Sequence, residues 1–121
     1  MVPENLDLSI ALVGSAKIRK LNKIYLKKNR VTDTLAFSEN SKFKISTVST
    51  HQPPKSLGEI VICLREVKKN AKRFGQSYKK ELARVLIHGI LHLLGYDHEI
   101  SKKRAKEMEI KQEYYLSQIK F

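Results

Sequence analysis

Residues 58–64, Gly-Glu-Ile-Val-Ile-Cys-Leu, carry the strongest strand signal of this sequence. After the glycine and glutamate, β-branched and apolar side chains follow one another without alternation. A strand that faces water on one side alternates apolar and polar residues, whereas a continuous apolar run is typical of a strand buried on both faces. We therefore predict a strand in the interior of the protein.

Further strands are predicted earlier in the chain. Residues 6–13 alternate in the period of a half-buried strand, and residues 34–37, Thr-Leu-Ala-Phe, form a short apolar run. Residues 42–48 suit a strand at the edge of a sheet. They fall in a predicted loop, residues 38–56, which is rich in Ser and Thr and contains two prolines.

Four helices are predicted from apolar spacing and capping residues. An amphipathic helix with a basic outer face covers residues 15–28, and a short helix covers residues 65–74. A long helix runs from an N-cap at Ser77 to Gly95, and its apolar stripe is Leu82, Val85, Leu86, Gly89, Ile90 and Leu93. A last helix opens at Ser101, and the residues expected to face inward are Ala105, Met108, Tyr115 and Ile119. The order of elements is mixed α and β.

Length and composition favour one globular domain over residues 1–121. The hydrophobic fraction of 41% is enough for a modest core, which excludes a disordered, fibrous or disulfide-scaffold protein. The formal net charge of +12 exceeds what solubility requires and indicates a polyanionic partner. RNA, DNA and an anionic membrane surface all fit this charge.

The single cysteine, Cys63, has no second cysteine for an internal disulfide, and the first residues lack the pattern of a signal peptide. No apolar run approaches the roughly 20 residues of a transmembrane helix. We therefore expect a soluble, cytoplasmic protein with no membrane partner.

Three of the four histidines fall within eleven residues, at His88, His92 and His98. His88 and His92 are four apart on a predicted helix, so both side chains leave the same face and can share a metal ion. Gly95 can end the helix in a left-handed conformation and let the chain bring His98 back toward the same point. Three imidazoles leave one coordination position open, which is the arrangement of catalytic zinc.

Other interpretations of these histidines stay open. A single histidine on a helix is more often an ordinary hydrogen-bonded side chain than a ligand, although three at this spacing favour a metal. A structural zinc site has four protein ligands. Cys63 would supply the fourth if its strand lay against the histidines.

The spacing of the three histidines matches the zinc-binding helix of metalloproteases, H-E-x-x-H-x-x-G-x-x-H. Those enzymes use the glutamate as the base, and this chain has Gly89 in its place. Glu59 and Asp97 are the carboxylates left as candidate bases. Asp97 equally suits a turn or a hydrogen bond to a histidine.

The run His-Gly-Ile-Leu-His-Leu-Leu-Gly-Tyr-Asp-His at residues 88–98 closely resembles the signature of the YbeY family, bacterial metal-dependent endoribonucleases. Leu-Asn at residues 21–22, Thr-Asp-Thr-Leu-Ala-Phe-Ser at 32–38 and Leu-Gly-Glu-Ile-Val-Ile-Cys at 57–63 are similar to further segments of that family, in the same order. The resemblance covers most of the chain from residue 21 to residue 98.

The resemblance implies an α/β (α+β) fold, with a small, mixed but mostly parallel sheet of about four strands flanked by helices. It implies one Zn²⁺ per chain, held by His88, His92 and His98. It also implies endonucleolytic action on single-stranded or precursor ribosomal RNA, in formation of the 3′ end of small-subunit 16S RNA and in ribosome quality control. The implied partners are the small ribosomal subunit and its assembly factors.

One departure from the family concerns the basic groove. The family usually has an arginine where this chain has Leu26. Lys27, Lys28 and Arg30 are the nearby cations that can supply the charge for RNA binding, although lysine lacks the forked geometry of arginine.

A zinc-dependent endoribonuclease is therefore the first hypothesis for function. The second is an RNA-binding ribosome assembly factor whose metal holds the fold or recognises RNA. The third is a zinc hydrolase of peptides, which Gly89 and the high charge both disfavour. For a ribonuclease, the attacking group is either water or the RNA 2′-hydroxyl, and the sequence leaves both open.

Overall fold

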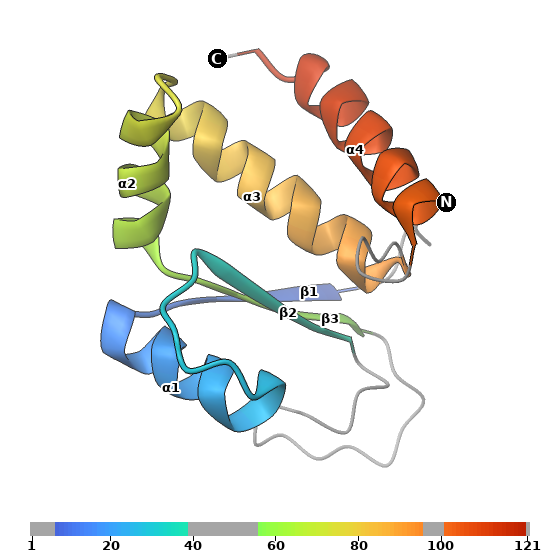
Figure 1. The fold of residues 1–121 in the computed structure, drawn as a ribbon. Coiled ribbons are helices and arrows are strands. Elements are labelled where there is room, and N and C mark those ends of the chain that lie inside the picture. Colours follow the sequence, from blue (N-terminus) through green and yellow to red (C-terminus); the bar gives the residue numbers. More distant parts are fainter. Residues whose placement is uncertain (1–6, 39–55, 96–100, 121) are drawn as a thin grey trace.

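The computed structural model describes residues 7–38, 56–95 and 101–120 (Figure 1). Its sheet has, in the described residues, three strands in the order β1-β3-β2. The strands are β1 (Asp7–Leu12), β2 (Thr34–Ser38) and β3 (Ser56–Ile62). The central strand, β3, is parallel to β1 and antiparallel to β2.

The buried central strand predicted from the sequence is confirmed. Ile60, Val61 and Ile62 are at most 1% exposed, because β3 has a strand on each side and a helical layer on each face. The strand ends at Ile62, and Cys63 is the N-cap of the next helix. The prediction that Leu64 belongs to the strand is therefore wrong, since this residue begins the helix.

The sheet is mixed, as expected. One of its two pairings is parallel and the other antiparallel, so the expectation of a mostly parallel sheet is not confirmed. The predicted edge strand at residues 42–48 lies outside the described residues, and the expected total of about four strands is likewise not confirmed.

Four helices complete the described structure. Helix α1 (Ser15–Leu26) covers one face of the sheet, and α2 (Leu64–Arg73) and α3 (Tyr78–Leu93) cover the other (Figure 1). Helix α4 (Lys102–Ser117) packs along α3. No helix in these ranges is both long and apolar enough to cross a membrane.

Each face of the sheet has its own apolar cluster, because successive side chains of a strand point to opposite faces. Val61 points toward α1 and packs with Ile18 and Leu21. Ile60 and Ile62 point toward the other helical layer. That cluster also contains Val67 and Val85, with Leu82, Leu86, Ile90 and Leu93 packed against it.

The ends of α3 and α4 follow the predicted capping residues. The hydroxyls of Ser77 and Ser101 each accept a hydrogen bond from a backbone N–H three residues later, at 3.1 Å. Gly95 has φ +100°, a backbone conformation that residues with a side chain rarely adopt. The sequence prediction of these boundaries is confirmed.

The inward face of α4 differs from the prediction. Met108 is buried as expected, but Tyr115 is 46% exposed and Ile119 is 42% exposed, so their predicted inward position is wrong. The buried residues are Met108, Gln112 and Leu116, spaced one helical turn apart. An amide occupies the middle position of the buried face, so the spacing of apolar side chains predicts only part of this face correctly.

Candidate functional site

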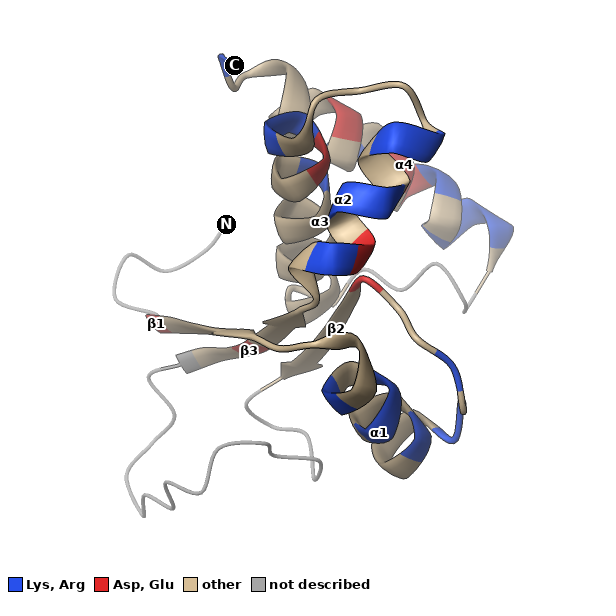
Figure 2. Cartoon of the chain, turned by 90° about the vertical axis from the view of Figure 1, so that its left-hand side faces the viewer, with Lys and Arg blue, Asp and Glu red and all other residues tan. Residues whose placement is uncertain are grey.

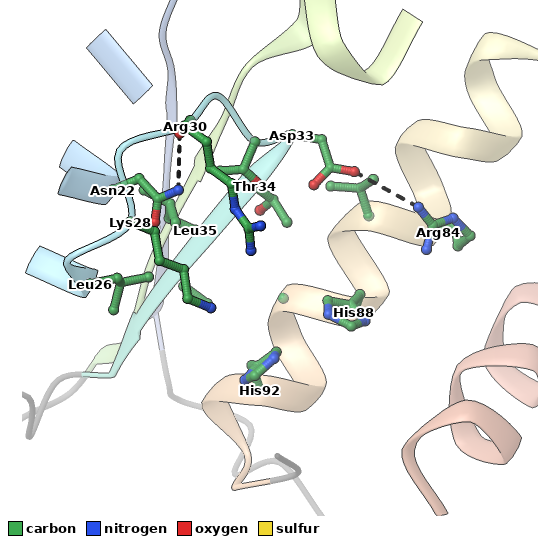
Figure 3. A pocket seen from close by; sticks show the side chains of 14 residues that line it. Asn22, Leu26, Lys28, Arg30, Asp33, Thr34, Leu35, Arg84, His88 and His92 are labelled. Carbon is green, nitrogen blue, oxygen red and sulfur yellow. Dashed lines mark hydrogen bonds and ion pairs between the residues drawn. The ribbon is translucent and has the colours of Figure 1, made fainter. Parts of the chain in front are cut away.

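A pocket of about 570 Å³ lies where the end of α1, the loop that follows it, β2 and α3 meet. His88 and His92 line it from α3, and Lys28 and Arg30 line it from the loop. Figure 3 shows the loop side chains projecting toward the helix that carries the histidines. The pocket therefore sets two imidazoles opposite two cations.

His88 and His92 lie one turn apart on the pocket side of α3. Their ring centroids are 5.1 Å apart, with 66° between the ring planes. Two imidazoles at this separation on one helix face are the donor set of an H-x-x-x-H metal site.

His88 also makes a hydrogen bond that suits a metal ligand. Its Nδ1 lies 2.8 Å from Oε1 of Gln112 in α4. Because an amide oxygen only accepts, Nδ1 donates, and in the neutral ring the lone pair is then on Nε2. Metal-binding histidines commonly have such an outer partner. The described side chains therefore fit a metal ion bound through imidazole nitrogen.

The third predicted ligand, His98, lies outside the described residues, as does Asp97. Within the described ranges, no group of three His, Cys, Asp or Glu side chains is placed to hold a metal. The complete three-histidine site, with Asp97 beside it, therefore stays a prediction.

Glu59 does not line the pocket. It is on β3, two residues before Val61, and therefore on the sheet face that packs against α1. His88 and His92 belong to α3, on the other face. Cys63, proposed as the fourth ligand of a structural site, is fully buried in the α1 cluster.

Gly89, between the two histidines, is where α3 approaches the sheet. A β-carbon there would lie 2.9 Å from Cδ1 of Ile60 and 3.3 Å from its Cγ1 and Cγ2. Ile60 is fully buried. This position therefore has no room for the glutamate base of the metalloprotease helix.

The loop after α1 places the cations. Lys27 ends the helix with φ 60°, a left-handed conformation, and does not line the pocket. Lys28 and Arg30 follow it and do. Leu26, where the resemblance implies an arginine, lines the pocket and is 42% exposed.

Asn22 holds this loop in place and was not singled out as a functional residue from the sequence. Its side-chain Nδ2 donates to the backbone oxygen of Arg30 at 3.0 Å, and its own backbone oxygen accepts from N–H of Lys28 at 3.2 Å. Asn22 is 2% exposed. Its Oδ1 is buried without a hydrogen-bond partner in the described part of the chain.

A charged network occupies the far end of the pocket, and sequence analysis missed it. Arg84, one turn before His88, donates to the fully buried Glu81 from Nε at 2.8 Å and from Nη2 at 2.7 Å. Its Nη2 is 3.9 Å from Oδ2 of Asp33, which also accepts from Nδ2 of Asn70 at 3.2 Å.

The hydrogen bonds to Glu81 raise the pKa of Arg84 above its ordinary value, against the opposing effect of burial. The guanidinium therefore stays charged, and it lines the same pocket as His88. The available sequence signal was the spacing of residues 84, 88 and 92, which places all three on one helix face.

Basic side chains extend beyond the pocket. Figure 2 shows them on α1, on the following loop and on the outer face of α2. The exposed ones on the two helices are Lys17, Arg19, Lys20, Lys23, Arg65, Lys68, Lys69, Lys72 and Arg73. A surface of this kind binds polyanions through their backbone charges.

Comparison with known proteins gives one consistent family. A family model described as Endoribonuclease YbeY matches residues 1–120. The Endoribonuclease YbeY of Leptospira interrogans is 40% identical over 116 residues, covering 88% of this chain and 82% of that protein. The Endoribonuclease YbeY of Geobacillus thermodenitrificans is 37% identical over 118 residues, covering 96% and 74%.

In two further matches a smaller share of the other protein is covered. The Endoribonuclease YbeY of Persephonella marina is 41% identical over 109 residues, covering 87% of this chain and 65% of that protein. A solution structure from Thermotoga maritima superimposes with a TM-score of 0.58 at 38% identity, covering 92% of this chain and 66% of the other. The chain thus spans just under two thirds of each of these two proteins.

Proposed function

Since the chain belongs to the YbeY family of endoribonucleases, we propose that it is a metal-dependent endoribonuclease that processes ribosomal RNA. The substrate is single-stranded precursor RNA at the 3′ end of the small-subunit RNA. Its partners are then the small ribosomal subunit and assembly factors, in the cytoplasm, and ribosome quality control belongs to the same proposed role.

The observation that carries this proposal is the placement of two imidazoles and two cations around one pocket. We propose that His88 and His92, with His98, hold one zinc ion per chain. Bound there, zinc would supply Lewis acidity at the scissile phosphate.

Lys28 and Arg30 bind the RNA backbone in this proposal. Both line the pocket across from the histidines. Their charges neutralise phosphates, which gives affinity that depends on salt and little on sequence. Lys27 does not line the pocket, so it contributes at most to the positive electrostatic potential around it.

The candidate carboxylates have different proposed roles in the reaction. Asp97, adjacent to His98 in the sequence, is still the proposed base or hydrogen-bond partner of a histidine. Glu59 is on the sheet face away from α3 and does not line the pocket. We therefore propose that any effect of Glu59 on the reaction passes through other residues. Asp33 lines the pocket and is paired with Arg84.

The proposal is tested with a 3′-extended small-subunit ribosomal RNA fragment and three proteins: wild type, His92→Ala and His51→Ala. His51 is the one histidine outside the 88–98 run and serves as the matched control. We expect cleavage by wild type and by His51→Ala, and none by His92→Ala, with bound zinc lost only from the last. Circular dichroism checks that all three are folded.

Equal cleavage by His92→Ala would indicate a contaminating nuclease or a metal-independent reaction and would contradict the proposal. If all three proteins bound RNA and none cleaved it, the test would be repeated with intact small ribosomal subunits. Binding without cleavage there too would favour an assembly factor instead. Cleavage of a peptide substrate would revive a zinc hydrolase.

A further inference from the structure

Gln112 is a buried amide on the face of α4 that packs against α3. It is 9% exposed and lies one turn from Met108 on one side and from Leu116 on the other. Both neighbours are apolar and buried. An amide in such surroundings is unfavourable unless it is hydrogen-bonded.

The partner that satisfies Gln112 is a predicted metal ligand. Oε1 of Gln112 lies 2.8 Å from Nδ1 of His88, 24 residues earlier in the chain. The amide oxygen has no proton to give, so the imidazole nitrogen must be the donor. A neutral imidazole has one ring proton, and this hydrogen bond keeps it on Nδ1.

We propose that Gln112 is a positioning residue, which holds His88 in the Nδ1–H tautomer and directs the Nε2 lone pair to a divalent metal. The inference rests on the proposed metal centre. Outer partners of ligating histidines fix ring orientation and raise ligand basicity, and their loss typically weakens metal binding by about 10–100-fold. Helix α4, which contributes none of the predicted ligands, thereby becomes part of the site.

Two substitutions separate the hydrogen bond from the packing of α4. Gln112→Met keeps an unbranched side chain of similar length and removes the acceptor oxygen. Gln112→Glu keeps an acceptor and is the rescue variant. Leu116→Met, one turn away on the same buried stripe, is a matched control for repacking.

The first measurement is the tautomer of His88 in metal-free protein, read from long-range proton–nitrogen-15 correlation spectra above the ordinary histidine pKa of about 6.5. We expect the Nδ1–H form in wild type, Gln112→Glu and Leu116→Met. In Gln112→Met we expect the proton to populate both nitrogens. An Nε2–H form in wild type would overturn the inference without any variant, as would an unchanged tautomer in Gln112→Met.

The second measurement is zinc affinity, by competition with a chromophoric chelator. We expect Gln112→Met to bind about 10–100-fold more weakly than wild type, and Gln112→Glu and Leu116→Met to bind like wild type. If Gln112→Met shifted the tautomer of His88 but bound zinc as tightly as wild type, the positioning role would be overturned.

These measurements distinguish the two proposals. Absence of zinc binding by wild type would overturn the metal centre and with it the positioning role for Gln112. Normal zinc binding with no response to Gln112→Met would overturn only the role of Gln112. Thermal unfolding of each variant identifies any loss of binding that comes from unfolding.

Discussion

Gly89 stands where a metalloprotease has its catalytic glutamate, and the structure gives a packing reason for the glycine. The absent β-carbon is what lets α3 rest on Ile60 of the central strand. The two neighbouring ligand positions thus depend on a close helix–sheet contact. A base for the reaction must come from elsewhere.

Replacement of Gly89 by alanine tests this contact. Alanine favours a helix by about 1 kcal/mol, but overpacking a core costs about 1–3 kcal/mol. We expect a net loss of about 1 kcal/mol in the free energy of unfolding, measured with urea. Ile60→Val removes the Cδ1 atom nearest the added carbon, so Gly89→Ala should be better tolerated in that background. If the effects of Gly89→Ala and Ile60→Val on the free energy of unfolding were strictly additive, the proposed contact between the two residues would be contradicted.

Leu26 offers a second test at the scale of one residue. It lines the pocket, at a position where the resemblance to the family implies an arginine. We expect Leu26→Arg to raise the affinity for single-stranded RNA and to steepen its logarithmic salt dependence by about 0.7, the value for one added phosphate contact. Fluorescence anisotropy over a salt series measures both.

Ile24→Arg is the matched control for Leu26→Arg. It adds the same charge to the same helix, at a side chain that is 49% exposed and does not line the pocket. An equal gain in RNA affinity from both variants would mean that only net charge matters.

At the scale of elements, the loop between α1 and β2 forms the basic wall of the pocket. Its path is set by the left-handed conformation of Lys27 and by the hydrogen bonds of Asn22. These contacts place Lys28 and Arg30 in the lining of the pocket that His88 and His92 also line. Local backbone geometry thus selects which cations face the site.

Removing both pocket cations, as Lys28→Gln with Arg30→Gln, should weaken RNA binding and reduce the salt slope by about 1.4. The control is Lys103→Gln with Lys106→Gln, which removes the same charge from the exposed surface of α4. We expect the control to keep most of the affinity and of the cleavage rate. The same loss in both pairs would contradict a localised RNA-binding wall.

For the whole molecule, the apolar core and the predicted metal site are separate. Among the described residues, the two buried clusters contain no histidine, and His88 and His92 line a pocket beside the sheet. We therefore expect the core to form without a metal, as for a catalytic metal and unlike a structural one.

We expect chelation to stop RNA cleavage while the circular dichroism spectrum is unchanged. Zinc at 100 times its dissociation constant should stabilise wild type by about 2.7 kcal/mol and leave His92→Ala unaffected. Differential scanning calorimetry with and without zinc measures this. Unfolding on chelation would indicate a structural metal and contradict the separation.

The predictions that held came from patterns within one element. The apolar run of β3 lacks the alternation of a half-exposed strand, and the caps at Ser77 and Ser101 follow from a hydroxyl side chain at a helix start. The pairing of His88 with His92 on one helix face follows from the period of 3.6 residues. All three are properties of residues close together in the chain, so the sequence alone determined them.

The tertiary structure decided what meets across elements. The hydrogen bond between His88 and Gln112 joins α3 to α4, and the ion pair between Asp33 and Arg84 joins a loop to α3. Periodicity carries no information about such partners, because they depend on how two elements pack. It also selects apolar side chains, so it favoured Tyr115 over Gln112 for the buried face of α4. A polar residue is buried where a partner on another element satisfies it, and only the packed chain brings that partner within reach.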